Sequence, residues 1–498
     1  MTIEIKNLTF GYDSQGNLLF DQANVTIDES WKLALIGRNG RGKTTLLQLL
    51  LNNLPFAGTI THQLNFTYFP QTVADASQLT YQVLQDLGVF EDWQLEKELN
   101  LLKVDLECLW RPFEQLSGGE QTKVLLALLF LDEGDFPLID EPTNHLDMAS
   151  RQLVAEYLQK KRQGFILVSH DRSFVDQVTD HVLAIDKSQL SQYQGNFSTY
   201  EAQKARVDEF ELAENQKLQG EIKRLQQTSR EKANWSMSRE SDNHGNPHVK
   251  GSGGTGHDGF TSAKAAKMMK RSKAIETRLG TSVTEKQKLL KNLEFVDELT
   301  MNYQANYHDI LLTAENVQLF FPNTPPLFQQ INFQLKKGER LALIAPNGSG
   351  KSSLIKALLD DFPGEISGTL SIIRPLKISY VRQNYEDNRG TLVDFADSRG
   401  LDYQIFLSNL KKLGMERNVF SNRIEEMSMG QRKKVEIAQS LAQPAEIYLW
   451  DEPLNYLDVF NQKQLTELIL TSQPTMIIIE HEADFIEKIG AKKIELIP

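Results

Sequence analysis

The sequence GRNGRGKTT at residues 37–45 decides how the first part of this chain folds. It lies between the apolar run Lys32–Ile36 and a helical stretch, which is the setting of a glycine-rich loop whose backbone holds phosphate groups. A second copy, APNGSGKSS at residues 345–353, follows the apolar run Arg340–Ile344. Further motifs recur at nearly the same offset, so the chain is predicted to contain a duplicated domain.

Both halves of the chain alternate short β-rich runs with helical stretches. Phe165–Val168 and Met476–Ile479 are further runs of this kind. This alternation is typical of an α/β fold with a parallel sheet. We therefore expect two domains, at residues 1–195 and 308–498, joined by a linker at residues 196–307.

The two loops contain the groups that a nucleotide phosphate needs. Successive backbone N–H groups and a helix N-terminus attract the phosphates, the lysines add charge, and the hydroxyls of Thr44 and Ser352 suit Mg²⁺. Ala345 replaces the first glycine of the second loop, and its methyl group is tolerable if its φ is ordinary. The residues expected to hold ATP are Gly37, Asn39, Gly40, Gly42, Lys43, Thr44 and Thr45, and then Asn347, Gly348, Gly350, Lys351, Ser352 and Ser353.

Two acids end an apolar strand in each half, downstream of the loop. They are Asp140 and Glu141 in LIDE, and Asp451 and Glu452 in LWDE. We assign Asp140 and Asp451 to the Mg²⁺ shell, and Glu141 and Glu452 to the attacking water as catalytic residues. The sequence Pro-x-Asn-x-x-Asp follows in both halves, which strengthens the assignment.

Between loop and acids lie LSGGEQ at 116–121 and MSMGQ at 427–431. These resemble the signature motif of ATP-binding cassettes, in which a serine and bare backbone at a helix N-terminus meet a phosphate. The resemblance implies that Ser117, Gly118, Gly119, Ser428 and Gly430 contact the ATP of the opposite cassette. Met429 replaces a glycine, so the site that it completes, in the first cassette, is expected to differ in rate.

The same resemblance assigns roles to four further residues. Gln71 and Gln383 match the glutamine that reaches the metal, and His170 and His481 match a catalytic switch histidine. It also implies a monomer in which the cassettes form a head-to-tail sandwich around two ATP molecules. Tyr12 and Phe321 occupy matching places near the start of each cassette, where they could stack on adenine or simply pack in the core.

Composition excludes several classes of protein. No apolar run reaches the eighteen or more residues of a membrane span. No membrane partner is expected, because the long basic stretch between the two halves argues against one. The N-terminus lacks a signal pattern, and a single cysteine, Cys108, is typical of a cytoplasmic protein. The net charge is −12, but residues 217–278 contain 13 Lys and Arg against 6 Asp and Glu. That basic segment either attracts phosphate backbones or is an ordinary solvated helix surface.

The linker is predicted to form an antiparallel helical hairpin. Tyr200–Glu240 is rich in helix formers, with a seam at Leu218, Ile222 and Leu225. A Gly-rich turn at 241–262 separates it from a second helical stretch at 261–301. Each arm of about 40 residues would be roughly 60 Å long. A flexible linker is the alternative, which the apolar seam argues against.

The whole chain resembles subfamily F of the ATP-binding cassettes (ABC-F). The runs WRPFEQLSGGE (110–120), WSMSRE (235–240), MKRSK (269–273), SYVRQNYEDNRGTL (379–392) and GMERNVFSNRIEEMSMGQRKK (414–434) resemble its antibiotic-resistance branch of the Lsa type. This implies a partner, the 70S ribosome, bound at the tRNA exit site through 23S rRNA and peptidyl-site tRNA. It also implies protection of the peptidyl-transferase centre from lincosamides, streptogramin A and pleuromutilins.

Within that resemblance, Lys250, His257 and Phe260 at the linker tip are predicted to lie nearest the drug or the tRNA end, although Phe260 could pack between the helices. The basic residues expected to contact RNA phosphates are Arg224, Arg230, Lys232, Lys264, Lys267, Lys270, Arg271 and Lys273. Three alternatives stay open: a housekeeping translation factor, the ATPase subunit of a membrane exporter, and a DNA-repair ATPase.

Overall fold

The computed structural model describes residues 2–12, 18–132, 134–144, 146–186, 188–243, 277 and 298–497. The chain divides into two compact units. One unit contains both halves of the duplication, Met1–Tyr200 and Val296–Pro498, and the other is Glu201–Phe295. The domain boundaries at 195 and 307 remain predictions.

The first half contains a six-stranded sheet in the order β5-β6-β7-β3-β8-β9. The first five strands run parallel, and β9 is antiparallel to β8. A smaller antiparallel sheet has the order β2-β1-β4. The strands are β1 Thr2–Phe10, β2 Phe20–Asp28, β3 Lys32–Ile36, β4 Ala57–Thr61, β5 Asn65–Phe69, β6 Asp135–Asp140, β7 Phe165–Val168, β8 His181–Asp186 and β9 Gln189–Gln194.

The second half repeats this plan. Its parallel sheet has the order β14-β15-β16-β12-β17, which matches β5-β6-β7-β3-β8, and its antiparallel sheet has the order β11-β10-β13. The duplicated parallel α/β core predicted from the sequence is therefore confirmed. The strands are β10 Ile310–Phe320, β11 Ile331–Lys336, β12 Arg340–Ile344, β13 Glu365–Ile372, β14 Ile378–Val381, β15 Ile447–Asp451, β16 Met476–Ile479 and β17 Lys492–Glu495.

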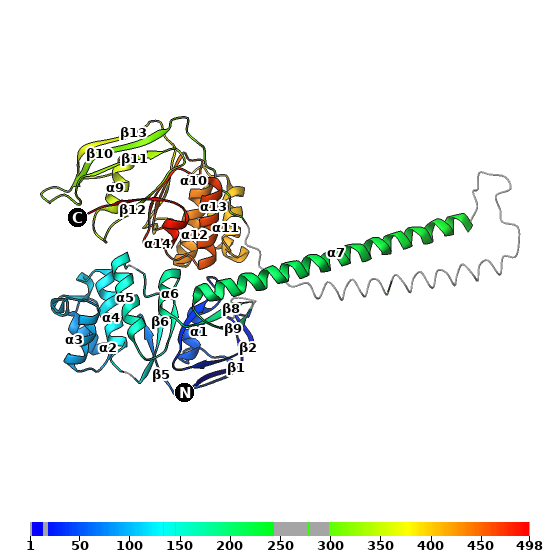
Figure 1. The fold of residues 1–498 in the computed structure, drawn as a ribbon, viewed down its shortest axis with the longest axis horizontal. Helices are drawn as coiled ribbons and strands as arrows, with labels where there is room; N and C mark the ends of the chain where they lie inside the picture. Colours follow the sequence, from blue (N-terminus) through cyan, green and yellow to red (C-terminus); the bar gives the residue numbers. More distant parts are fainter. Residues whose placement is uncertain are drawn as a thin grey trace. The chain divides into compact units, whose positions relative to one another are not determined.

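The helices of each half cover its parallel sheet. Figure 1 shows β10, β11 and β13 on one side of the second half and helices α10 to α13 on the other. The first half contains α1 Lys43–Leu50, α2 Thr80–Leu87, α3 Asp92–Leu101, α4 Gly118–Leu129, α5 Met148–Lys160 and α6 Arg172–Val178. The second half contains α9 Lys351–Leu358, α10 Leu392–Ser398, α11 Tyr403–Lys412, α12 Met429–Ala442, α13 Val459–Ser472 and α14 Ala483–Lys488.

Alternation along the central strands fills two cores in each half. In β3, Leu33 and Leu35 join the core beneath the antiparallel sheet, whereas Ala34 and Ile36 join the core beneath the helices. Successive strand residues point to opposite faces, so a strand buried on both faces is apolar throughout. This is why Lys32–Ile36 is a nearly continuous apolar run. Packing on both faces also holds the end of β3, where the phosphate loop begins, in place.

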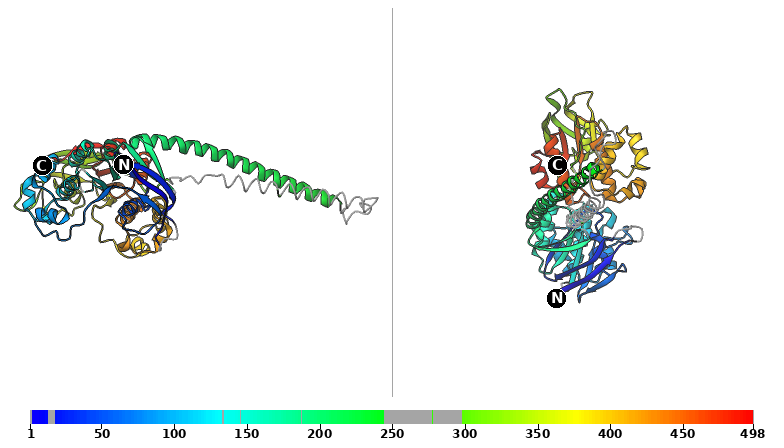
Figure 2. Two further views of the ribbon diagram at one scale, coloured as in Figure 1. Left: turned by 90° about the horizontal axis from the view of Figure 1, so that it is seen from below. Right: turned by 90° about the vertical axis from the view of Figure 1, so that its right-hand side faces the viewer.

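The linker begins with one long helix, α7 Phe197–Asn243. Figure 2 shows α7 without a break. Its 47 residues correspond to about 70 Å. The first predicted helical arm is therefore confirmed and is slightly longer than expected. The second arm and the tip residues Lys250, His257 and Phe260 lie outside the described residues, except for Thr277.

In each half, a glycine lies where two strands of the antiparallel sheet approach closely, β4 and β1 in the first half and β13 and β10 in the second. A substitution at this glycine tests the fold. Gly58 in β4 has a φ of +110°, and a Cβ there would lie 2.5 Å from the Asn7 carbonyl oxygen. Gly368 in β13 repeats this, with a φ of +85° and a distance of 2.2 Å to the Asn316 oxygen.

Gly58→Ala is expected to lower the free energy of unfolding by about 1–3 kcal/mol, because the methyl group meets backbone that cannot move away. Thermal unfolding measures this. Gly220→Ala, in the exposed part of α7 with no atom within 4 Å, is the control and should cause no loss. Equal unfolding temperatures for Gly58→Ala and the parent would contradict the close approach.

Candidate functional site

Each glycine-rich loop is held in the conformation that a phosphate requires. Gly42 and Gly350, at the starts of α1 and α9, have φ values of +94° and +86°. Both lack space as well: a Cβ would lie 3.1 Å from Phe20 Cζ or 3.0 Å from Leu327 Cβ. Only glycine satisfies both conditions, so the loop can turn tightly and direct backbone N–H groups inward.

The loop lysines are buried and bind the loops themselves. Lys43 Nζ donates to the carbonyl oxygen of Gly37 at 2.8 Å, and Lys351 Nζ donates to that of Ala345 at 2.8 Å. Burial lowers the pKa of both lysines, although nearby carboxylates oppose the shift. The backbone at Ala345 lies outside the left-handed region, so its methyl group leaves the second loop intact.

The two predicted metal sites are built alike. Thr44 Oγ1 donates to Asp140 Oδ2 at 2.7 Å, and Ser352 Oγ donates to Asp451 Oδ2 at 2.9 Å. Asp451 Oδ1 is buried and has no hydrogen-bond partner among the described residues, so it is an acceptor that a cation would satisfy. In the described part of the chain, no group of three or more His, Cys, Asp or Glu residues could hold a metal ion by itself. This suits Mg²⁺ held by one carboxylate, one hydroxyl and nucleotide phosphates.

Glu141 and His170 meet in the first half. His170 Nε2 lies 3.2 Å from Glu141 Oε1, and the His170 N–H donates to Glu141 Oε2 at 3.4 Å. Burial raises the pKa of Glu141 to about 8, while Lys43 opposes the shift. Burial also lowers the pKa of His170 to about 3, with Lys43 acting in the same direction. At neutral pH this histidine is therefore uncharged.

Glu452 and His481 meet in the second half under different electrostatics. His481 Nε2 lies 3.7 Å from Glu452 Oε1, and Asn455 donates to Glu452 Oε2 at 2.6 Å. Burial raises the Glu452 pKa, but hydrogen bonds from His481 and Gln383 and the charges of His481 and Lys351 outweigh it and hold the pKa at about 2. This glutamate is ionised at neutral pH, whereas burial dominates the shift at Glu141. Both glutamates have a positive φ, +53° and +47°, strain that is common where function dictates geometry.

The first loop is completed by the second half. The Asn39 N–H donates to Asp458 Oδ2 at 2.8 Å, and Asn39 Nδ2 donates to the Tyr456 carbonyl oxygen at 2.9 Å. A Cβ on Gly430, in the second signature, would lie 3.4 Å from Asn39 Nδ2 and 3.1 Å from the Tyr456 oxygen. Ser428 caps α12 beside it, accepting from the Gln431 N–H. The structure thus brings the second signature to the first loop.

The second loop meets the first half through the matching aspartate. The Asn347 N–H donates to the Asp147 carboxylate, as the Asn39 N–H does to Asp458. A cavity of about 700 Å³ lies beside this contact, lined by Met148 and Arg151 of the first half and by Ala345 and His481 of the second. Of the first signature residues, Ser117 caps α4, and Ser117 and Gly118 are exposed at its start.

The two candidate adenine partners are exposed, as stacking requires. Tyr12 is 40% exposed, and its hydroxyl lies 3.2 Å from Thr45 Oγ1 at the start of α1. Phe321 is 37% exposed and packs against Phe362, with ring centroids 5.3 Å apart. A fully buried core position is excluded for both, and stacking on adenine remains a prediction.

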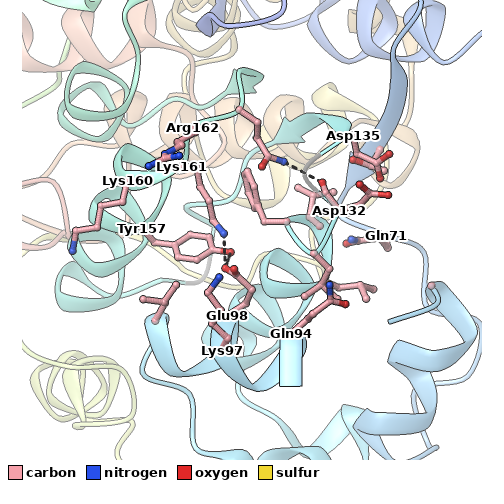
Figure 3. Close-up of a pocket in the computed structure, with 18 of the residues that line it drawn as sticks. Gln71, Gln94, Lys97, Glu98, Asp132, Asp135, Tyr157, Lys160, Lys161 and Arg162 are labelled. Atoms are coloured by element: carbon pink, nitrogen blue, oxygen red, sulfur yellow. Dashed lines mark hydrogen bonds and ion pairs between the residues drawn. The ribbon is translucent and has the colours of Figure 1, made fainter. Parts of the chain in front are cut away.

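The two glutamines predicted near the metal behave differently. Gln383 donates to Glu452, whereas Gln71 Nε2 donates to the Leu125 carbonyl oxygen at 3.2 Å. The buried Oε1 of Gln71 has no hydrogen-bond partner within the described part of the chain. Gln71 also lines a groove of about 1140 Å³, in which Glu98 accepts from Tyr157 at 2.7 Å and from Lys161 at 2.5 Å. Figure 3 shows Gln71 on the right of this groove and Lys160 on the left.

Comparison with known proteins identifies the family. A family model described as ABC transporter matches residues 20–144 and 328–455, just over half of the chain. The chain belongs to the ABC transporter family. A second model of the same description matches residues 183–242. The two halves are therefore ATP-binding cassettes, and the chain is an ATP hydrolase.

The curated relatives align over almost the whole chain. Ribosome protection protein VmlR of Bacillus subtilis (strain 168) is 27% identical over 497 residues, covering 99% of this chain and 86% of the relative. Erythromycin resistance ATP-binding protein MsrA of Staphylococcus epidermidis is 27% identical over 520 residues, covering 99% of this chain and 98% of the relative. Together with two cassettes in one chain, these relatives support membership of the ABC-F subfamily.

Solved structures share the tandem-cassette fold. The structure described as RNase-L Inhibitor superposes with a TM-score of 0.63 at 18% identity, covering 98% of this chain and 87% of that one. The complex of archaeal ribosomal stalk protein aP1 with the recycling factor aABCE1 gives a TM-score of 0.61 at 18% identity, with the same coverage. Within the described residues, no helix is long and apolar enough to cross a membrane.

Asp147 and Asp458 are the site residues that sequence analysis missed. Both end the Pro-x-Asn-x-x-Asp motif that follows the acid pair, and that repeat was the available signal. Asp458→Ala removes the acceptor for the Asn39 N–H. It should lower hydrolysis at the first site about tenfold by loosening the ATP-bound arrangement, measured in a Glu452→Gln background.

The control for this variant is Asp402→Ala. Asp402 also caps a helix, α11, but does so on the exposed surface of the second cassette. Losing either cap costs about 1 kcal/mol, so the control reports that cost alone. Equal rates for the two variants would refute a role of Asp458 in the first site.

Proposed function

We propose that this chain is a ribosome protection factor of the Lsa type. It binds the 70S ribosome at the tRNA exit site, contacts 23S rRNA and peptidyl-site tRNA, and protects the peptidyl-transferase centre from lincosamides, streptogramin A and pleuromutilins. It acts in the cytoplasm, without a membrane partner. The observation that carries the proposal is the alignment of a ribosome protection protein and an erythromycin resistance protein over 99% of this chain, including its linker.

The linker supplies the reach that the proposal requires. Helix α7 alone corresponds to about 70 Å, long enough to extend well into a large RNA assembly. Lys223 and Arg224 on this helix are exposed, at the start of the basic segment of an otherwise acidic chain. Basic side chains on a long helix suit phosphate backbones rather than a membrane subunit.

Hydrolysis at the first site follows from the contacts of Glu141, His170 and Thr44. Loop N–H groups and Lys43 hold the phosphates, while Glu141 accepts a proton from water as its oxygen attacks the γ-phosphorus and the bond to the β-phosphate oxygen breaks. His170 contacts Glu141 and orients it. Mg²⁺, when bound by Thr44 and Asp140, neutralises phosphate charge.

The two cassettes then act as a switch. ATP bound between the Asn39 loop and the Gly430 turn favours the closed arrangement, and loss of the γ-phosphate removes that bridge. We infer that the closed state binds the ribosome and that hydrolysis drives release.

Ribosome co-sedimentation with ATP tests this switch. The Glu141→Gln, Glu452→Gln variant should bind ATP without hydrolysing it, so we expect stable capture on 70S ribosomes. Lys43→Ala, Lys351→Ala, which loses phosphate binding, should remain in the supernatant. Recovery of the glutamine variant with membranes, and not with ribosomes, would instead favour an exporter subunit.

Drug protection distinguishes resistance from a housekeeping role. In translation assays containing a lincosamide or a pleuromutilin, the wild-type chain should restore synthesis. Removal of the Gly-rich stretch 251–256 should abolish protection while co-sedimentation and ATP hydrolysis are retained. If the wild-type chain binds ribosomes but does not protect translation from the drug, the resistance proposal is wrong and a general translation factor is favoured.

A further inference from the structure

Gln462, on α13 of the second cassette, contacts both cassettes through one amide group. Its Nε2 donates to the His170 carbonyl oxygen of the first cassette at 3.2 Å and to Glu482 Oε1 of its own cassette at 3.1 Å. The residue is only 3% exposed, so water does not readily replace these bonds. One buried amide therefore joins the chain segments that contain the two switch histidines.

At the first site, this contact fixes the peptide that carries the imidazole. The His170 N–H is held by Glu141 Oε2 at 3.4 Å, and its carbonyl oxygen is held by Gln462. The ring itself lies 3.2 Å from Glu141 Oε1. Displacing this backbone would change the distance between imidazole and glutamate, and a shift of about 1 Å at a reacting centre can cost on the order of 10²-fold in rate.

At the other end, Gln462 contacts the residue directly after His481. The imidazole of His481 lies 3.2 Å from Lys351 Nζ and 3.7 Å from Glu452 Oε1, inside the second site. A change of nucleotide state at the second loop that moves His481 therefore moves Glu482. Because Glu482 and His170 accept from the same amide group, a displacement of Glu482 also displaces the His170 backbone in the first site.

The duplicated position in the first cassette differs. Arg151 of α5 occupies the place matching Gln462, and its guanidinium pairs with Asp171 at 3.0 Å within the first cassette. Asp171 follows the first switch histidine as Glu482 follows the second. Each residue thus binds the acid of its own cassette. Gln462 adds the bond to the His170 carbonyl oxygen, so it joins the two switch segments through direct hydrogen bonds.

We propose that Gln462 is a positioning residue for hydrolysis at the first site. Its side chain holds the His170 backbone in a position that depends on the conformation of the His481 segment. It contacts no reacting atom and acts through His170. The inference rests on the roles proposed above for Glu141 and His170, and it is independent of ribosome binding.

The test measures single-turnover hydrolysis of radiolabelled ATP in a Glu452→Gln background, where only the first site turns over. Gln462→Met keeps the length of the side chain but removes its donors. We expect about a tenfold lower rate, with ATP affinity within twofold. Gln464→Met is the matched control, because Gln464 lies on the same helix, is 5% exposed and donates to the Lys412 carbonyl oxygen within the second cassette. Its rate should fall less than twofold.

A double-mutant cycle separates positioning from general damage to the fold. With His170→Ala present, Gln462→Met should lower the residual rate less than twofold, because no imidazole remains to be positioned. Gln462→Arg, which restores N–H donors, should recover the rate to within threefold of the parent.

Equal tenfold losses with and without His170, or an unchanged rate for Gln462→Met, would overturn the proposal. If Glu141→Gln in the same background left turnover intact, the roles of Glu141 and Gln462 would fall together. Ribosome co-sedimentation is unaffected by either result, so failure here is distinguishable from failure of the protection function.

Discussion

The hydrogen bond from the Asn39 N–H to the Asp458 carboxylate joins the two cassettes at the predicted first ATP site, so residues of both cassettes form that site. Asn39 lies in the phosphate loop, where its side chain also reaches Lys43 at 3.2 Å. Asp458 ends the turn that follows the second acid pair and caps α13 through the Asn461 N–H. The predicted phosphate loop is thus attached to the helix that carries Gln462. This attachment is the physical basis for the proposed coupling of the two sites.

Duplication has produced two sites with the same motifs and different surroundings. In the second cassette, the partly exposed Arg382 forms an ion pair at 2.9 Å with the buried Glu436, between the loop of Gln383 and helix α12. The matching residues of the first cassette are Pro70 and Leu125, which cannot ionise. Burial leaves Glu141 with a raised pKa, whereas the partners of Glu452 lower its pKa. Unequal rates at the two sites are the expected consequence, beyond the effect of Met429.

The sequence predicted features that depend on local patterns. The runs Lys32–Ile36 and Met476–Ile479 are strands with those bounds, because strands buried on both faces are continuously apolar. Contacts between distant segments could not be predicted from the sequence. The Pro-x-Asn-x-x-Asp repeat does not indicate which loop Asp458 contacts, because its partner Asn39 lies in the other cassette. The opposite pKa shifts of two glutamates in the same motif depend on distant neighbours such as Gln383 and could not be read from the motif itself.

The most direct measurement of this account is intrachain cross-linking of Arg38→Cys with Phe460→Cys. The Arg38 guanidinium lies 5.2 Å from the centre of the Phe460 ring, across the two cassettes. Cys108 need not be removed, because burial raises its thiol pKa to about 11 and makes it unreactive. With a short bismaleimide and ATP, we predict a cross-linked product of single-chain mass. Cross-links found only between two chains, or none with ATP, would contradict a sandwich formed within one molecule.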